Sequence, residues 1–199
     1  MRFILASASP RRYEILTGLG LPVSVSVSDV NEDSDITDPA RLTEELAKRK
    51  AEAVAKTLDS TNETVIIACD TVVVCDTEIL GKPKDEKDAE GMLRMLSGRE
   101  HSVVSGICVV SGEKTVTAHE STTVRFAALT EKDIKTAVTL GAPLDKAGAY
   151  AIQGTASLFI EGIKGDYFSV VGLPVNLLFR TLRDEFSIDL CDHIKKEMG

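Results

Sequence analysis

We expect the fold to be organised around one apolar stretch, Val65-Ile66-Ile67-Ala68-Cys69-Asp70-Thr71-Val72-Val73-Val74. Six of its ten residues are Val or Ile, and a stretch rich in β-branched side chains is typical of a strand covered on both faces. One acid, Asp70, stands within this run. An ionised carboxylate is costly there unless a cation, a metal ion or hydrogen-bond donors meet it. We therefore expect Asp70 to face partners at a functional site, rather than to end a shorter strand and cap a turn.

Length and composition are those of an ordinary globular protein. The 199 residues suffice for one core, arranged as one domain or as two small lobes. The net charge of −8 argues against generic binding to nucleic acid or to an anionic membrane. The apolar start at 3–6 is too short for a signal peptide, and no stretch approaches the length of a membrane span. The four cysteines lack a paired metal spacing, which predicts reduced thiols and a cytoplasmic location.

The segment Ser9-Pro10-Arg11-Arg12 indicates an anion site at the start of a helix. After a short strand at 3–6, Ser9 is a good N-cap and Pro10 a good first helical residue. Arg11 and Arg12 then fall in the first turn, where the helix dipole is positive and cations are unfavourable. A bound phosphate would reverse this, because backbone N–H groups, hydroxyls and guanidinium groups can all donate to it. Taken alone, the segment fits a surface helix with two solvated arginines equally well.

A further cation occupies an unusual position on a predicted helix over residues 38–58. At 100° per residue, Leu46, Val54 and other apolar side chains share one face, and Lys50 falls in the middle of that face. The aliphatic part of a lysine can lie along such a face while its ammonium group reaches water. The other interpretation is an anionic partner, and Asp70 or a ligand phosphate would serve.

Two other segments add charge. The acidic loop 29–35 has the composition of a solvated turn, although one of its acids could hold a divalent ion. Gly81-Lys82-Pro83 follows a predicted hairpin return at 75–80 and so places a second lysine near the strand of Asp70.

The remaining pattern interleaves strands with helices, which indicates a mixed sheet of the α/β or α+β class. The predicted strands cover 22–28, 101–110, 115–127 and two stretches around 164–166. The predicted helices cover 10–19, 85–98, 130–141 and 174–186, with a loop at 145–154.

Seven segments together resemble the Maf family of nucleotide pyrophosphatases: SASPRR, KRKA, CDTVV, GKPKD, LSGREHSVVSG, DKAGAYAIQG and GDYFSVVGLP occur in the family's order. The resemblance spans residues 3 to about 183 and leaves the tail after Phe186 outside. It implies a mixed α/β fold similar to that of the inosine-triphosphate pyrophosphatases. In that fold residues 1–199 form a single domain, with an elongated, twisted mixed sheet flanked by helices and two lobes with a cleft between them.

The resemblance also implies a reaction and the residues that perform it. A nucleoside triphosphate is hydrolysed to the monophosphate and pyrophosphate with the help of a divalent metal cation, Mg²⁺ or Mn²⁺. Asp70 corresponds to the proton acceptor and Glu32 to an acid needed for catalysis, and both are expected to hold the metal. The positions that match the family's phosphate-handling groups are Ser9, Arg12, Lys50 and Lys82. The branch that acts on dTTP and UTP is matched at Arg11, Thr71 and Gln153.

Two positions depart from the family pattern, and the chemistry of Gln153 supports the branch. Ala151 replaces a usual glycine, and Asn31 replaces an acid that often precedes Glu32. A glutamine amide offers one acceptor and one donor side by side, which matches the N3–H and O4 edge of uracil or thymine. We therefore expect Gln153 to read this edge.

Two other functions stay open at this point. One is a pyrophosphatase for modified purine nucleotides, and the other is a nucleotide-sensing regulator of cell division. The joint presence of Asp70, Glu32, Lys50 and Lys82 favours an enzyme, because water activation needs a base and departing pyrophosphate needs positive charge. The expected partner is a nucleoside triphosphate, with no nucleic acid and no membrane, and a homodimer is allowed.

Overall fold

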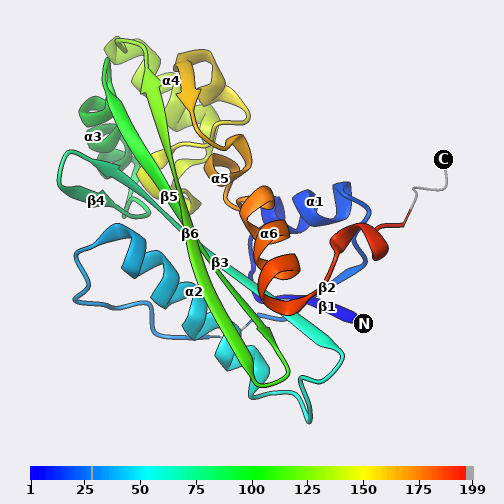
Figure 1. The fold of residues 1–199 in the computed structure, drawn as a ribbon. Coiled ribbons are helices and arrows are strands. Elements are labelled where there is room, and N and C mark those ends of the chain that lie inside the picture. The colour runs from blue at the N-terminus through cyan, green and yellow to red at the C-terminus, as the bar shows by residue number, and fades with distance from the viewer. Residues whose placement is uncertain (28, 196–199) are drawn as a thin grey trace. The chain divides into compact units, whose positions relative to one another are not determined.

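The computed structural model describes residues 1–27 and 29–195, and it divides into two compact units (Figure 1). The first unit comprises Met1–Asp70, Ser105–Glu120 and Gly172–Gly199, and the second comprises Thr71–Val104 and Ser121–Val171. No helix within 1–27 and 29–195 combines the length and the hydropathy that a membrane crossing requires. That 1–199 forms a single domain around a cleft stays a prediction.

The strands form one seven-stranded mixed sheet in the described part of the chain, in the order β2-β1-β3-β5-β6-β7 with β4 paired to β3. β1 lies parallel to both β2 and β3, whereas β4 and β7 are antiparallel to β3 and β6. The bounds are β1 Arg2–Leu5, β2 Val23–Val25, β3 Thr64–Cys75, β4 Glu78–Leu80, β5 Glu100–Ser111, β6 Lys114–Phe126 and β7 Ile160–Lys164. The mixed α/β class and the strand around Asp70 are thus confirmed.

Helices cover both faces of the sheet in the first unit (Figure 1). α1 (Pro10–Gly18) and α6 (Val175–Phe186) pack on one face, with a short 3₁₀ turn η4 (Leu190–Asp192) beside them. α2 (Pro39–Ala55) packs on the other face. Its backbone approaches β5 so closely that a Cβ added at Gly106 would lie 2.6 Å from Glu44 N, so this crossing requires glycine.

Alternation along β3 sends its side chains to these two faces in turn. Val65, Ile67 and Cys69 contribute to the core beneath α1 and α6. Ile66 and Ala68 contribute to the core beneath α2. The next residue in the row of Ile66 and Ala68 is Asp70, and the carboxylate is therefore directed to the α2 face.

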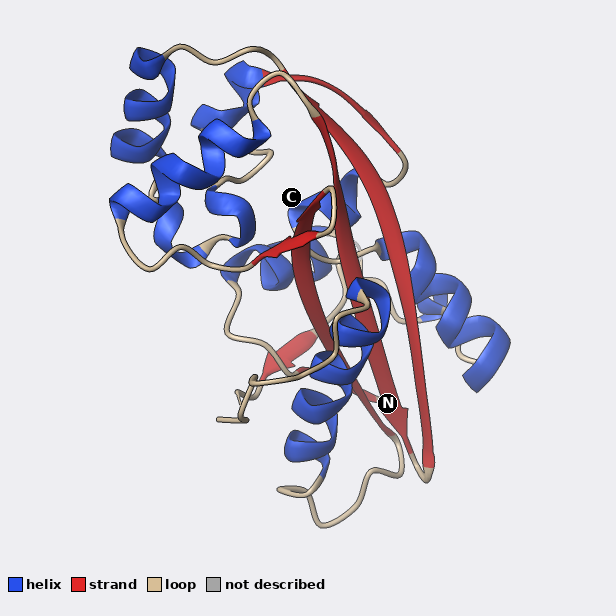
Figure 2. Cartoon of the chain, turned by 90° about the vertical axis from the view of Figure 1, so that its left-hand side faces the viewer, coloured by secondary structure: helices blue, strands red, loops and turns tan. Residues whose placement is uncertain are grey.

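In the second unit, helices gather on one side of the strands (Figure 2). α3 (Glu86–Leu96) and α4 (Glu131–Gly141) contact each other, and three short 3₁₀ segments, η1 Pro143–Asp145, η2 Ala147–Ala149 and η3 Thr155–Phe159, complete the layer. Their shared core includes Val73, Leu93, Phe126 and Ile134, all buried. Side chains cap the starts of both helices: Asp85 accepts from the Asp88 N–H, and Thr130 and Asp133 make a reciprocal capping box.

The structure corrects the sequence prediction at two places. Only one strand, β7, lies near 164–166, and the apolar run after it forms α5 (Tyr167–Val171). Gly165 turns the chain at φ +133°, and the Asp166 carboxylate then accepts from the Ser169 N–H, which caps a helix in place of a second strand. The strand predicted over 22–28 is also shorter, because β2 ends at Val25; Ser28 lies outside the described residues.

Candidate active site

Asp70 and Lys50 meet between β3 and α2. Lys50 Nζ lies 2.5 Å from Asp70 Oδ1, and only 14% and 13% of the two side chains are exposed. The alternation of β3 directs Asp70 toward α2, and the position of Lys50 on the apolar face of α2 directs it toward the sheet. Of the two interpretations of Lys50, the anionic partner is confirmed, and Asp70 is one such partner.

Glu32 approaches the same ammonium group from a segment without regular secondary structure. Its Oε1 lies 2.8 Å from Lys50 Nζ, and its side chain is 53% exposed. One lysine therefore bridges two carboxylates, one from a buried strand and one from an open loop.

The two carboxylates suit a divalent cation. Their oxygens converge on one positive group, and Mg²⁺ is commonly held by one or two carboxylates together with phosphate oxygens of a substrate and water. Within 1–27 and 29–195, no group of three or more His, Cys, Asp and Glu side chains is arranged to hold a metal ion. A cation at Glu32 and Asp70 would complete its coordination with other oxygen atoms, such as those of substrate phosphates and water.

Arg12 is fixed at the start of α1. Its Nε donates to the Gly172 carbonyl at 2.8 Å and its Nη1 donates to Ser7 Oγ at 3.0 Å. Ser7 Oγ also accepts from the Ser9 N–H at 3.2 Å, and Ser9 occupies the N-cap position without a capping hydrogen bond from its side chain. The N–H groups of the first turn, which the Ser9 side chain does not cap, therefore lie next to the fixed guanidinium group of Arg12. An anion site requires this arrangement.

Strand register and one carbonyl group connect this helix start with Asp70. β1 is parallel to β3, with Leu5 opposite Ile67, so the turn that leads from β1 into α1 follows the level of residues 68–70. The Gly172 carbonyl that holds Arg12 also accepts from the Cys69 thiol, with Sγ at 3.1 Å. Cys69 directly precedes Asp70 in β3.

Arg11, the remaining predicted site residue of the first unit, lies half-buried in the first turn of α1. Thr71, Lys82 and Gln153 belong to the second unit. Thr71 is half-buried in β3, whereas Lys82 and Gln153 are exposed in loops. The Gly148 N–H donates to the Gly81 carbonyl at 3.0 Å and so ties the segment that precedes Gln153 to the one that carries Lys82. That these three residues act with Asp70 stays a prediction.

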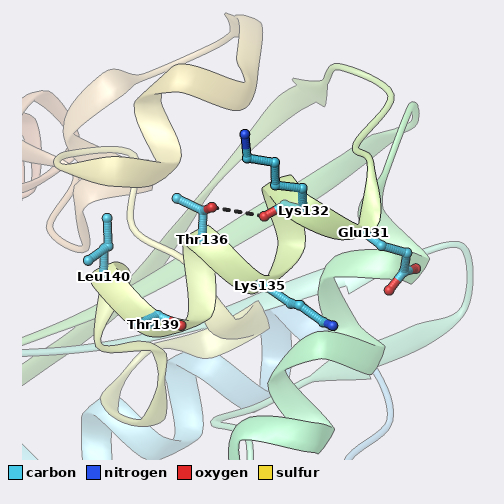
Figure 3. Close-up of a pocket in the computed structure, with 6 residues that line it drawn as sticks. All are labelled: Glu131, Lys132, Lys135, Thr136, Thr139 and Leu140. Carbon is cyan, nitrogen blue, oxygen red and sulfur yellow. Dashed lines mark hydrogen bonds between the residues drawn. The ribbon is translucent and has the colours of Figure 1, made fainter.

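A hollow of about 520 Å³ lies elsewhere, along α4 (Figure 3). It is lined by Glu131, Lys132, Lys135, Thr136, Thr139 and Leu140. All six belong to one helix, and the Thr136 hydroxyl donates to the Lys132 carbonyl of the same helix at 2.8 Å. None of the predicted site residues lines this hollow, so we do not assign the reaction to it.

Sequence reasoning missed three contributors to the site. Ser7 holds Arg12, and its position in SASPRR was a usable signal because hydroxyls accept from guanidinium groups. The Gly172 carbonyl could not be foreseen, since a backbone oxygen carries no side-chain signal. Arg49 lies outside the apolar face of the predicted helix, yet its Nη1 donates to the carbonyls of Asn31 and Asp33 on either side of Glu32.

The mixed sheet and its helices define an α/β protein. Its candidate site combines a base with cations, because Asp70 and Glu32 flank Lys50 and Arg12 lies at the start of α1. Hydrolysis of a phosphoanhydride requires such a combination. The chain belongs to the Maf family: the family model described as "Maf-like protein" matches residues 2–185. The predicted family membership is confirmed.

Two named relatives agree with this assignment, and a solved structure shares the fold. The chain is 45% identical over 190 residues to a protein of Bacillus cereus named dTTP/UTP pyrophosphatase, covering 95% of this chain and 97% of the relative. A protein of Symbiobacterium thermophilum with the same name is 48% identical over 176 residues, covering 88% and 89%. The Ham1 protein of Staphylococcus aureus superposes with a TM-score of 0.50 at 17% identity, covering 93% of this chain and all of that one. This last likeness supports the fold alone.

Proposed function

We propose that this protein is a nucleoside triphosphate pyrophosphatase that hydrolyses dTTP and UTP, and related modified pyrimidine nucleotides, to the monophosphate and pyrophosphate in the cytoplasm. The observation that carries the proposal is the Lys50 ammonium group held between Asp70 and Glu32. The names of the relatives support the substrate, since proteins 44–48% identical over most of the chain are called dTTP/UTP pyrophosphatases. The buried thiols of Cys75 and Cys108, which form no disulfide in the described part of the chain, agree with a reducing compartment.

Asp70 is proposed to take the proton. Its carboxylate accepts a proton from water as the water oxygen bonds to the α-phosphorus, and the bond from that phosphorus to the bridging oxygen of the β-phosphate breaks. Pyrophosphate leaves with the electron pair of the broken bond. Lys50 lies in contact with this carboxylate, with its Nζ 2.5 Å from Asp70 Oδ1.

Cations and helix N–H groups are proposed to bind the triphosphate. Arg12 and the first turn of α1 offer donors in fixed positions, and Lys82 is an exposed cation of the second unit. Glu32 and Asp70 would hold the divalent cation, which supplies charge neutralisation of the phosphates and lowers the pKa of water. Arg11, Thr71 and Gln153 are proposed to select the base.

A rate panel tests the proposal. The purified protein is assayed with dTTP, UTP, CTP, ITP and 7-methyl-GTP, each with Mg²⁺ or Mn²⁺, and pyrophosphate and monophosphate are both quantified. We expect dTTP and UTP to be hydrolysed fastest, and Asp70→Asn to bind nucleotide but to turn over at least about 100-fold more slowly. Preference for ITP or 7-methyl-GTP would instead establish the purine alternative, and absence of turnover with intact binding would establish the sensor.

A further inference from the structure

Glu32 is an acid whose position requires explanation. It lies in the segment between β2 and α2, in which the described residues 26–27 and 29–38 form neither helix nor strand. An irregular segment loses conformational freedom when it is ordered, so the contacts that order it must offset that cost. The carboxylate of Glu32 nevertheless reaches Lys50 Nζ at 2.8 Å.

The backbone on both sides of Glu32 is held by one guanidinium group. Arg49 Nη1 donates to the carbonyl of Asp33 at 2.9 Å and to that of Asn31 at 3.2 Å. Arg49 Nε donates to Glu45 Oε1 at 2.9 Å, one turn earlier on α2, which orients the planar group. The Asp33 N–H donates to Asn31 Oδ1 at 2.8 Å and closes a small turn around Glu32.

Arg49 and Lys50 are consecutive residues of α2, and successive side chains leave a helix about 100° apart. One of them therefore reaches the loop backbone while the other turns toward the sheet and Asp70. Two side chains of α2 thus fix Glu32. Arg49 binds the backbone next to it, and Lys50 binds its carboxylate.

We propose that Arg49 is a positioning residue that orders the loop around Glu32 so that its carboxylate is preorganised beside Asp70 for a divalent cation. The kinetic part of this inference rests on the proposed function. Arg49 makes its contacts with the loop backbone and Glu45, so the expected effect of its loss is weaker metal binding rather than weaker nucleotide binding.

The test compares Arg49→Ala with Lys48→Ala. Lys48 is the neighbouring cation on α2, and its only described ion pair is with Glu52 on the same helix, at 3.8 Å. At saturating dTTP, Arg49→Ala should raise the half-saturating Mg²⁺ concentration about tenfold, because metal binding must then order the loop, and should leave the KM for dTTP within about twofold. Lys48→Ala should change neither constant by more than about twofold.

Two further measurements separate positioning from a general structural role. Amide hydrogen exchange over 30–36 should become about tenfold faster in Arg49→Ala and stay unchanged in Lys48→Ala, a readout that needs no activity. In a Glu32→Gln background, Arg49→Ala should add less than about a twofold loss, because the residue it positions is already altered. Unchanged exchange, or a full additive loss in that background, would overturn the role of Arg49, whereas an inactive wild-type protein with altered exchange would overturn only the proposed function.

Discussion

Lys50 Nζ lies 2.5 Å from Asp70 Oδ1 within an otherwise apolar contact between α2 and β3. Lys50→Met removes the cation and leaves a nearly buried carboxylate unpaired, which is expected to lower the free energy of unfolding by about 3 kcal/mol. The double variant Lys50→Met/Asp70→Asn should recover at least half of this loss, since a neutral amide tolerates burial better. Urea unfolding at pH 7 measures both values.

The same two variants separate the effect of the ion pair on stability from its effect on the hydrolysis of dTTP. Neither variant should hydrolyse dTTP, although the double variant is the more stable one. A Lys50→Met protein as stable as wild type would mean that the ion pair contributes nothing net, as is common for exposed pairs.

Arg12 is expected to need its guanidinium shape as well as its charge. Arg12→Lys keeps the charge but cannot reproduce the two fixed donations to Gly172 O and Ser7 Oγ. We expect the KM for dTTP to rise about tenfold, equivalent to about 1.4 kcal/mol of lost binding, with a smaller change in kcat. Arg180→Lys is the matched control, because the Arg180 side chain donates a hydrogen bond to Asn176 within the same helix, α6. Equal KM values for dTTP in the two variants would show that Arg12 does not bind the substrate phosphates.

The sequence predicted Asp70 and Lys50 well because each breaks a strong pattern. Asp70 is the one acid in an apolar strand, and Lys50 is the one lysine on an apolar helical face, so both need partners. The periodicity of the strand directs Asp70 toward the helix, and that of the helix directs Lys50 toward the sheet. The helix caps Asp38, Asp85 and Thr130 are likewise features that the sequence can indicate, because capping uses neighbours in the chain.

Other features depend on contacts that local sequence does not carry. The run Tyr167–Val171 has strand-forming composition, yet the Asp166 cap and the turn at Gly165 make it helical. A Cβ at Gly165 would lie 2.7 Å from Thr122 Oγ1, a neighbour remote in sequence. The role of Arg49 depends likewise on two backbone carbonyls of a distant loop, whose positions no periodicity encodes.

His101 predicts how stability changes in acid. It is 3% exposed, its Nε2 lies 2.7 Å from the Tyr150 hydroxyl, and its Nδ1 is buried without a partner in the described structure. Burial lowers the pKa of His101 to about 4, and raises the pKa of Tyr150. The unfolded chain, with a histidine pKa near 6.5, therefore binds more protons between these two values. Stability should fall as the pH drops from about 6.5 to about 4, by up to about 3 kcal/mol from this residue.

His101→Gln isolates that contribution. The amide can keep a hydrogen bond to Tyr150 but does not titrate in this range. The difference in unfolding free energy between wild type and His101→Gln should change with pH from about 6.5 to about 4 and be constant above about 7.5. A difference that is constant over the whole range would show that His101 is protonated as easily in the folded protein as in the unfolded chain.

Gln153 provides the sharpest test of base selection. It lies exposed in a loop whose preceding residues are anchored within the second unit by the Tyr150–His101 contact and by the Gly148 N–H bond to Gly81 O. Gln153→Glu retains an acceptor for the thymine N3–H but loses the donor to O4, so kcat/KM should fall at least about tenfold for dTTP and less for CTP. Leu158→Glu, at a position 76% exposed, adds the same charge nearby and should leave the ratio of the two rates unchanged. If Gln153→Glu also leaves the dTTP-to-CTP ratio unchanged, Gln153 does not read the pyrimidine edge, and base selection must reside at Arg11 and Thr71.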